Sequence, residues 1–128
     1  MSIIRHNAFL WTLQIVLAVA FGISGLMKLT QHKEQLADQM GWVDDFSPTT
    51  VQLIGALELL GAVGLVLPAA TGTLAWLTPL AALGLLALML LAIPVHLRRH
   101  EASMVAVNVV VGLVAAFIAW QRLGPHAF

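Results

Sequence analysis

The chain has 128 residues, of which 60% are apolar and only 9% are charged, and its six basic residues balance its six acidic ones. A soluble domain carries about 25% charged residues, so most of this surface is not suited to water. The balanced charge argues against nucleic acid as a partner. Because there is no cysteine, disulfides, cysteine-held iron–sulfur clusters and thiol chemistry are excluded. The composition is typical of an integral membrane protein.

Four apolar stretches are long enough for membrane-spanning helices, which need about 18 residues or more. We predict these helices at about residues 8–29, 48–67, 74–97 and 102–122. The first stretch has no small-residue cleavage site after it, so we expect a retained helix and not a signal peptide. The predicted fold is an all-α membrane protein with a single domain over residues 1–128. This domain is a four-transmembrane-helix bundle with a short interfacial segment between the first and second helices.

The first predicted helix carries polar side chains on one stripe. Ser24 and Lys28 are four residues apart and therefore share a face. Lys28 is close to the helix end, where a long stem can carry the ammonium to the membrane interface. Gln14 lies on the same stripe and could extend a polar group deeper into the bundle.

The only polar segment of any length connects the first helix to the second. Residues 32–40 predict a short interfacial helix, with Leu36 and Met40 facing the lipid. Trp42 follows a glycine, and we expect its indole at the level of the lipid headgroups. Ser47 and Pro48 predict the N-cap and the first residue of the second helix.

Glu58 lies in the middle of the second apolar stretch. An ionised carboxylate in hydrocarbon costs about 2.5 kcal/mol or more, so Glu58 is either protonated or faces a protein interior that supplies partners. Gly55 and Gly61 on the same helix allow neighbouring helices to approach closely. We expect this helix to stop at Pro68.

The last two predicted helices contribute one polar residue each to the interior. His96 lies near the end of the third helix, just after Pro94, which should kink or end that helix. Asn108 on the fourth helix shares a stripe with Gly112 and Ala115, a seam of small residues suited to helix packing.

These polar residues converge in one half of the membrane. The four helices alternate in direction, and a helix rises about 1.5 Å per residue. On this basis we expect Lys28 and His96 near the membrane interface, on the side of the 30–48 segment. Ser24 and Asn108 should lie about 8–9 Å deeper than this interface, and Glu58 about 14 Å deeper. We therefore predict a ligand-binding polar pocket, without catalytic or metal-binding residues. Glu58 forms its floor, and Lys28, Ser24 or Asn108 could pair with the carboxylate.

Each of these residues also has a purely structural explanation. Glu58 can be protonated and hydrogen-bonded between helices, and Asn108 can join two helices. Lys28 can be an interfacial anchor, and His96 an interfacial imidazole. The convergence of all of them favours function, since ionisable groups inside a membrane usually mark functional sites.

Three segments resemble a known family: Phe21-Gly-Ile-Ser-Gly-Leu-Met-Lys-Leu29, Gly55-Ala-Leu-Glu-Leu-Leu-Gly61 and Ile93-Pro-Val-His96. They are similar to the DoxX family of small four-helix bacterial membrane proteins, and the resemblance covers nearly the whole chain. That family is named for a membrane component linked to a thiosulfate:quinone oxidoreductase or quinol oxidase. Other members are associated with oxidative-stress or quinone-resistance systems. The resemblance implies a multi-pass protein of the bacterial inner membrane, with Lys28, Glu58, His96 and Asn108 at positions of a polar pocket.

Two classes of function follow from these observations, and a third is less favoured. The first is an accessory subunit, not an enzyme on its own, that binds a quinone or small amphiphile for a membrane redox or oxidative-stress system. Its only cofactor would be the bound quinone, and its partners would be membrane lipid, a redox subunit and further copies of the chain, with no nucleic acid. The second is a structural or assembly protein without ligand chemistry. A small proton-coupled transporter is less favoured, because the chain has no internal repeat.

Overall fold

The computed structural model describes residues 2–37 and 40–124. Its four long helices are α1 (Ser2–Thr30), α3 (Pro48–Thr71), α4 (Leu77–Arg98) and α5 (Ala102–Leu123). Two short helical elements, α2 (Lys33–Ala37) and the 3-10 helix η1 (Gly41–Asp45), connect α1 to α3. The described residues contain no strand. Each long helix is long and apolar enough to cross a membrane, which confirms the predicted all-α four-helix fold.

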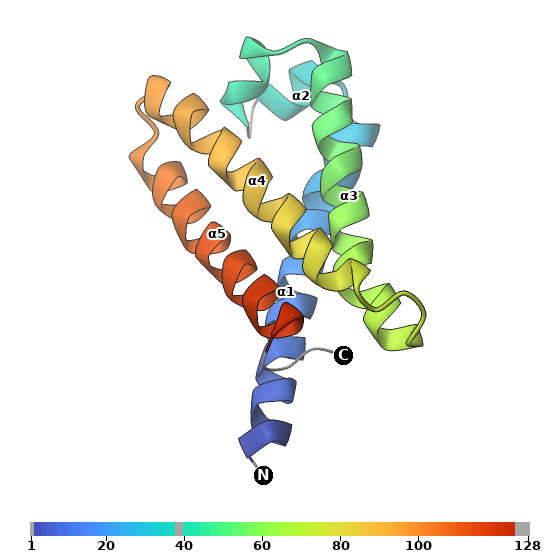
Figure 1. The fold of residues 1–128 in the computed structure, drawn as a ribbon. Helices are drawn as coiled ribbons and strands as arrows, with labels where there is room; N and C mark the ends of the chain where they lie inside the picture. The colour runs from blue at the N-terminus through green and yellow to red at the C-terminus, as the bar shows by residue number, and fades with distance from the viewer. Residues whose placement is uncertain (1, 38–39, 125–128) are drawn as a thin grey trace.

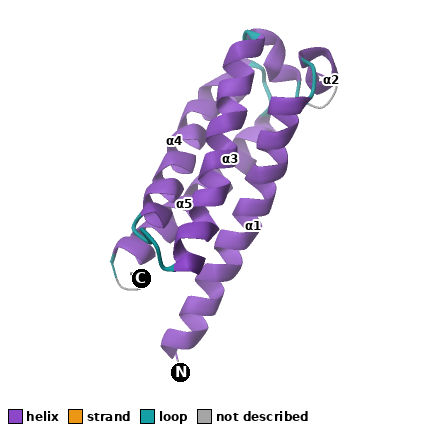
Figure 2. Ribbon diagram, turned by 90° about the vertical axis from the view of Figure 1, so that its right-hand side faces the viewer, coloured by secondary structure: helices purple, strands orange, loops and turns teal. Residues whose placement is uncertain are grey.

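The long helices form two pairs that meet at one end of the molecule. α1 packs mainly against α3, and α4 against α5, whereas α1 and α5 make little contact. Figure 1 shows α3 and α4 close together near their connection and well apart toward the end that carries α2. Figure 2, seen from the side, shows the axes of the four long helices roughly aligned along the length of the bundle. The bundle is therefore splayed at one end, which we call the loop end.

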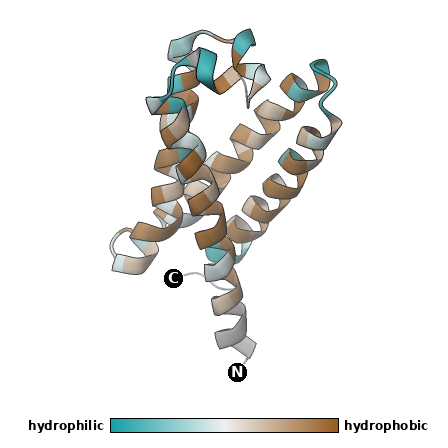
Figure 3. Ribbon diagram, turned by 180° about the vertical axis from the view of Figure 1, so that it is seen from behind, coloured by the Kyte–Doolittle hydropathy of each residue, from teal (hydrophilic) through white to brown (hydrophobic). Residues whose placement is uncertain are grey.

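Apolar side chains lie on the outside of the bundle as well as inside it. Figure 3 shows hydrophobic residues along all the long helices and hydrophilic ones gathered mainly at the loop end. The interior cluster includes Leu17, Phe21, Leu65 and Leu85, while large residues such as Leu60 are mostly exposed. An outer surface of this kind is stable in hydrocarbon and not in water. Four such helices make the chain a multi-pass membrane protein.

The α1–α3 pair is held together at two glycines. A Cβ atom added to Gly25 would lie 2.6 Å from the carbonyl oxygen of Gly55, and one added to Gly55 would lie 2.6 Å from the Cβ of Lys28. Neither position has space for a side chain. Small residues at such crossings let two backbones approach closely inside a membrane. The crossing lies at the same level as Ser24 and Lys28.

The expectation that Pro68 ends its helix is wrong, because α3 continues through Pro68 to Thr71. Proline has no N–H to donate to the carbonyl four residues earlier, which here belongs to Gly64. The hydroxyl of Thr78 on α4 donates to this carbonyl at 2.9 Å. Backbone carbonyls in hydrocarbon must be satisfied within the protein, and Thr78 satisfies this one. The helix then ends at Gly72, whose φ of +69° is the usual left-handed cap.

Other helix limits differ less from the prediction. α1 begins at Ser2, well before residue 8. α4 begins at Leu77 because Leu74 has a left-handed φ of 53°, which places it in the preceding turn. Pro94 lies inside α4, which continues to Arg98.

The connection between α1 and α3 folds back onto the bundle. The prediction that Leu36 faces lipid is wrong. Its side chain is only 1% exposed and packs against Val43 and Val51. A five-residue helix cannot show a periodicity long enough to identify its buried face. The predicted cap is confirmed, because the Ser47 hydroxyl accepts a hydrogen bond from the backbone N–H of Thr50 at 3.1 Å.

The glycine crossing leads to a prediction about stability. Gly25→Ala places a methyl group 2.6 Å from the Gly55 carbonyl oxygen and 2.9 Å from the Leu59 nitrogen, so α1 and α3 must move apart. Overpacking of this kind costs about 1–3 kcal/mol, and we expect a clearly lower Tm in mild detergent. Gly84→Ala is the matched control, because nothing lies within 4 Å of its added Cβ. Equal Tm values for the two variants would show that the helices do not meet at Gly25.

Candidate functional site

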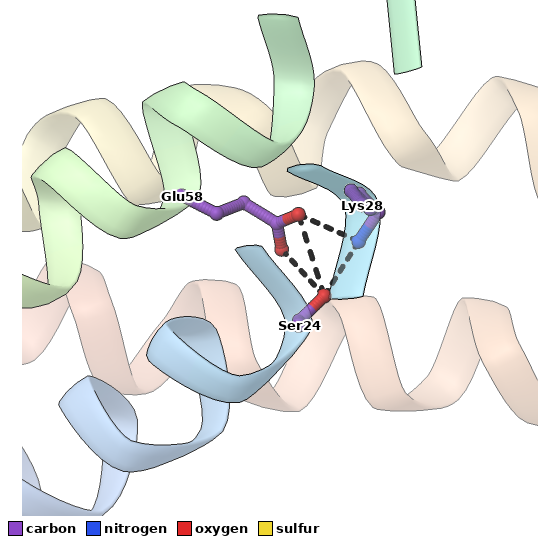
Figure 4. Close-up of polar contacts among 3 residues, drawn as sticks. All are labelled: Ser24, Lys28 and Glu58. Atoms are coloured by element: carbon purple, nitrogen blue, oxygen red, sulfur yellow. Dashed lines mark hydrogen bonds and ion pairs between the residues drawn. The ribbon is translucent and has the colours of Figure 1, made fainter. Parts of the chain in front are cut away.

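Glu58 has its partners on α1 (Figure 4). The ammonium Nζ of Lys28 lies 2.6 Å from Oε1 of Glu58, and the two side chains are 5% and 7% exposed. The Ser24 hydroxyl lies 3.1 Å from the carboxylate Oε2 and 3.3 Å from Oε1, and Lys28 donates to the Ser24 oxygen at 2.5 Å. The structure therefore contains a buried ion pair with a hydroxyl bridging its two members.

The predicted depth difference between Lys28 and Glu58 is wrong, because their charged groups are in direct contact. Depths counted in residues from the helix ends do not include the crossing of α1 and α3. The close approach at Gly25 and Gly55 brings the two side chains to one level. Lys28 is also covered by the connection, since its Nζ lies 5.5 Å from the centroid of the Trp42 ring. It is a buried member of the site and not an interfacial anchor.

A cavity of about 560 Å³ lies between the two helix pairs. Its wall is mostly apolar and comes from all four long helices and the connection. Trp42 forms part of this wall, together with Phe46, whose ring packs edge-on against the indole at 5.7 Å. The structure also places on the wall every residue that the sequence suggested for the pocket: Ser24, Lys28, Glu58, His96 and Asn108.

His96 does not pair with Glu58 but with a residue that the sequence had not suggested. Its Nδ1 lies 2.8 Å from Oε1 of Glu101, just before α5, and the imidazole is buried. Arg99 continues this network, with Nε 3.4 Å from the Glu101 carboxylate and Nη1 3.1 Å from that of Asp45. A chain of charged groups thus runs from the cavity wall to η1 at the loop end. The sequence pattern predicts no role for Glu101, Arg99 or Asp45.

Asn108 is buried, at 4% exposed. Among the described residues, the Glu58 carboxylate accepts hydrogen bonds from Ser24 and Lys28 and none from Asn108. Its Nδ2 atom is among the buried side-chain atoms without a hydrogen-bond partner in the described part of the chain. Ser24, the other suggested partner, does contact the carboxylate. Asn108, on the wall of the cavity, therefore has an amide N–H donor that no described residue accepts.

Gln14 belongs to a different polar cluster, away from the cavity. Its Nε2 donates to the Leu65 carbonyl at 2.6 Å, and its Oε1 accepts from Nε of Arg122 at 2.8 Å. Arg122 also donates from Nη1 to Asn7 Oδ1 at 2.8 Å and is almost fully buried. The suggestion that Gln14 extends the cavity group is wrong. This cluster joins α1, α3 and α5 at the end opposite the loop end.

Among the described residues, no group of three or more His, Cys, Asp or Glu side chains is arranged to hold a metal ion. The chemistry available at the cavity is hydrogen bonding and proton exchange at carboxylate, imidazole, hydroxyl and amide groups.

The buried ion pair leads to a prediction about stability. Glu58→Gln leaves the Lys28 ammonium buried without a counter-charge, which typically costs about 3–5 kcal/mol. The double variant Lys28→Met with Glu58→Gln removes both charges and should recover most of the Tm lost in the single variant. Asp45→Asn at the more exposed Arg99 pair is the control, expected to cost less than about 1 kcal/mol. A double variant as unstable as Glu58→Gln alone would contradict the burial of Lys28.

Comparison with known proteins identifies one family. A family model for the DoxX-like family matches residues 12–118, which include Ser24, Lys28, Glu58, His96 and Asn108. The curated proteins and the solved structures gave no match. Because the family match spans most of the chain, this protein belongs to the DoxX-like family.

Proposed function

We propose that this DoxX-like membrane protein binds a lipid-soluble small molecule, a quinone or a similar amphiphile, in the cavity between its two helix pairs. The observation that carries this proposal is the cavity itself. Its volume of about 560 Å³ lies within the range of small-molecule sites, which are mostly apolar with a few convergent polar groups. Here the apolar wall can hold a hydrocarbon body, and the Ser24, Lys28 and Glu58 cluster supplies polar groups.

Access from the membrane is supported by wall residues that are also exposed on the outside of the bundle. Leu91 on α4 is 71% exposed, and Val107 on α5 is 49% exposed. Both belong to helices that are long and apolar enough to span a membrane, so we expect their exposed surface to contact hydrocarbon. A ligand dissolved in the bilayer can therefore enter sideways without crossing water.

The chain's own residues would bind and orient such a ligand and exchange protons with it. A bound quinone would supply electron and proton transfer. The Nδ1 of His96 can exchange a proton with Glu101, whose side chain is 30% exposed, and so connect the cavity wall to the loop end. Electrons would come from or pass to a partner subunit. In this proposal the protein would serve as an accessory subunit of a redox or oxidative-stress system in a bacterial inner membrane.

A second candidate is a structural or assembly protein, and one observation favours it. Glu58 is fully engaged by Lys28 and Ser24 within the chain, so its burial requires no ligand. In that case the cavity would hold only lipid chains. The two candidates differ in whether a head group is recognised.

The test uses Trp42 as a reporter because it lies on the cavity wall. In protein with Trp11, Trp76 and Trp120 replaced by Phe, added decylubiquinone should quench Trp42 fluorescence in a saturable way. Ala92→Phe fills the cavity wall and should abolish saturation, leaving only the linear quenching caused by quinone in the detergent.

Ala87→Phe is the matched control, since Ala87 lies on the same helix, is exposed and does not line the cavity. It should bind like the parent. Linear quenching in all three proteins would reject the quinone proposal and favour the structural candidate.

A further inference from the structure

We infer that the cavity selects an uncharged head group bearing a hydrogen-bond acceptor, such as a carbonyl oxygen, and that this acceptor binds the side-chain amide of Asn108. The inference rests on the proposed function and specifies its ligand. Two sources share this chemistry: the ring carbonyl of a quinone and the ester carbonyl of a membrane lipid.

The donor comes from Asn108. Its side chain is 4% exposed, lines the cavity and has an Nδ2 without a hydrogen-bond partner among the described residues. Native proteins pair nearly all buried polar groups, so a buried donor without a partner needs an explanation. Asn108 lies less than two turns from the start of α5, inside a membrane-spanning helix where water is scarce. The amide rotates easily about χ2, so either end of it can be turned toward a bound molecule.

The restriction to an uncharged head group follows from the pairing of the buried charges. Lys28 donates hydrogen bonds to Glu58 and to Ser24, and its ammonium lies 5.5 Å from the centroid of the Trp42 ring. His96 is paired with Glu101. An ionised head group beside them would lose its hydration without gaining a counter-charge, which is strongly unfavourable.

One further charge borders the cavity. Arg98 lines its loop end, but its side chain is exposed there. Water and ions at the membrane surface screen such a charge. Arg98 therefore gives little advantage to an anion bound deeper, beside Asn108.

The experiment measures competition with decylubiquinone in the protein whose only tryptophan is Trp42. The competitors are methyl dodecanoate, which has a neutral ester carbonyl, dodecanoate at pH 9 and dodecyltrimethylammonium. We expect both ions to bind at least about tenfold more weakly than decylubiquinone. Competition by the methyl ester supports a carbonyl of the lipid type, and its failure to compete supports the quinone ring. Binding of either ion as tight as that of decylubiquinone overturns the inference.

A substitution at the donor provides the second arm. Asn108→Leu should weaken decylubiquinone binding about fivefold, the loss expected for one hydrogen bond. The Tm of the ligand-free variant should not fall, because an unpaired buried amide has been removed. Gln121→Leu makes the same chemical change on α5 outside the cavity and should leave the Kd unchanged.

If Asn108 only joins helices, Asn108→Leu lowers the Tm and leaves the Kd unchanged, which overturns the inference while the proposed function stands. If no neutral carbonyl probe binds any variant in a saturable way, the proposed function fails as well.

Discussion

The buried contact between Lys28 and Glu58 is the constraint on which the rest of the structure depends. A carboxylate in the middle of a membrane-spanning helix is stable only beside a partner, and here that partner is an ammonium at 2.6 Å on another helix. The contact requires α1 and α3 to cross closely, which Gly25 and Gly55 permit because a Cβ on either would collide with the opposite helix. The α1–α3 pair is thus fixed at the level of the charges. The α4–α5 pair does not share this restraint and diverges from it toward the loop end, which leaves the cavity (Figure 1).

The two ends of the bundle are built differently, and the difference explains where a ligand can bind. At the end opposite the loop end, the Thr78 hydroxyl donates to the Gly64 carbonyl, which has no backbone donor because residue 68 is proline. Arg122 donates to Gln14, and Gln14 donates to the Leu65 carbonyl. Hydrogen bonds between helices in hydrocarbon hold their backbones close. At the loop end, the ion pair between Arg99 and Asp45 connects the end of α4 to η1, which precedes α3. The cavity therefore lies toward the loop end, where the two helix pairs diverge, and the proposed ligand would bind there.

The fold could be predicted because an apolar run of sufficient length nearly always forms a membrane helix. The alternating direction of the helices also predicted that Glu58 and Asn108 lie in the same half of the membrane. The contacts could not be predicted in the same way. Which carboxylate His96 meets depends on the shape of the α4–α5 turn, and periodicity does not describe turns. The passage of α3 through Pro68 depends on Thr78, a donor from another helix. The burial of Leu36 depends on how a five-residue helix folds back, and so short a helix has no readable face.

The central claim is that the cavity holds a neutral lipid-soluble molecule, and native mass spectrometry tests this most directly. Protein released from mild detergent should carry one neutral adduct per chain, with a mass that identifies it as a quinone or a lipid. The same adduct should be missing from Ala92→Phe, whose added ring occupies the cavity wall, and present on Ala87→Phe, whose ring lies outside it. A bare chain for the parent protein, or equal adducts on the parent and Ala92→Phe, would contradict the account.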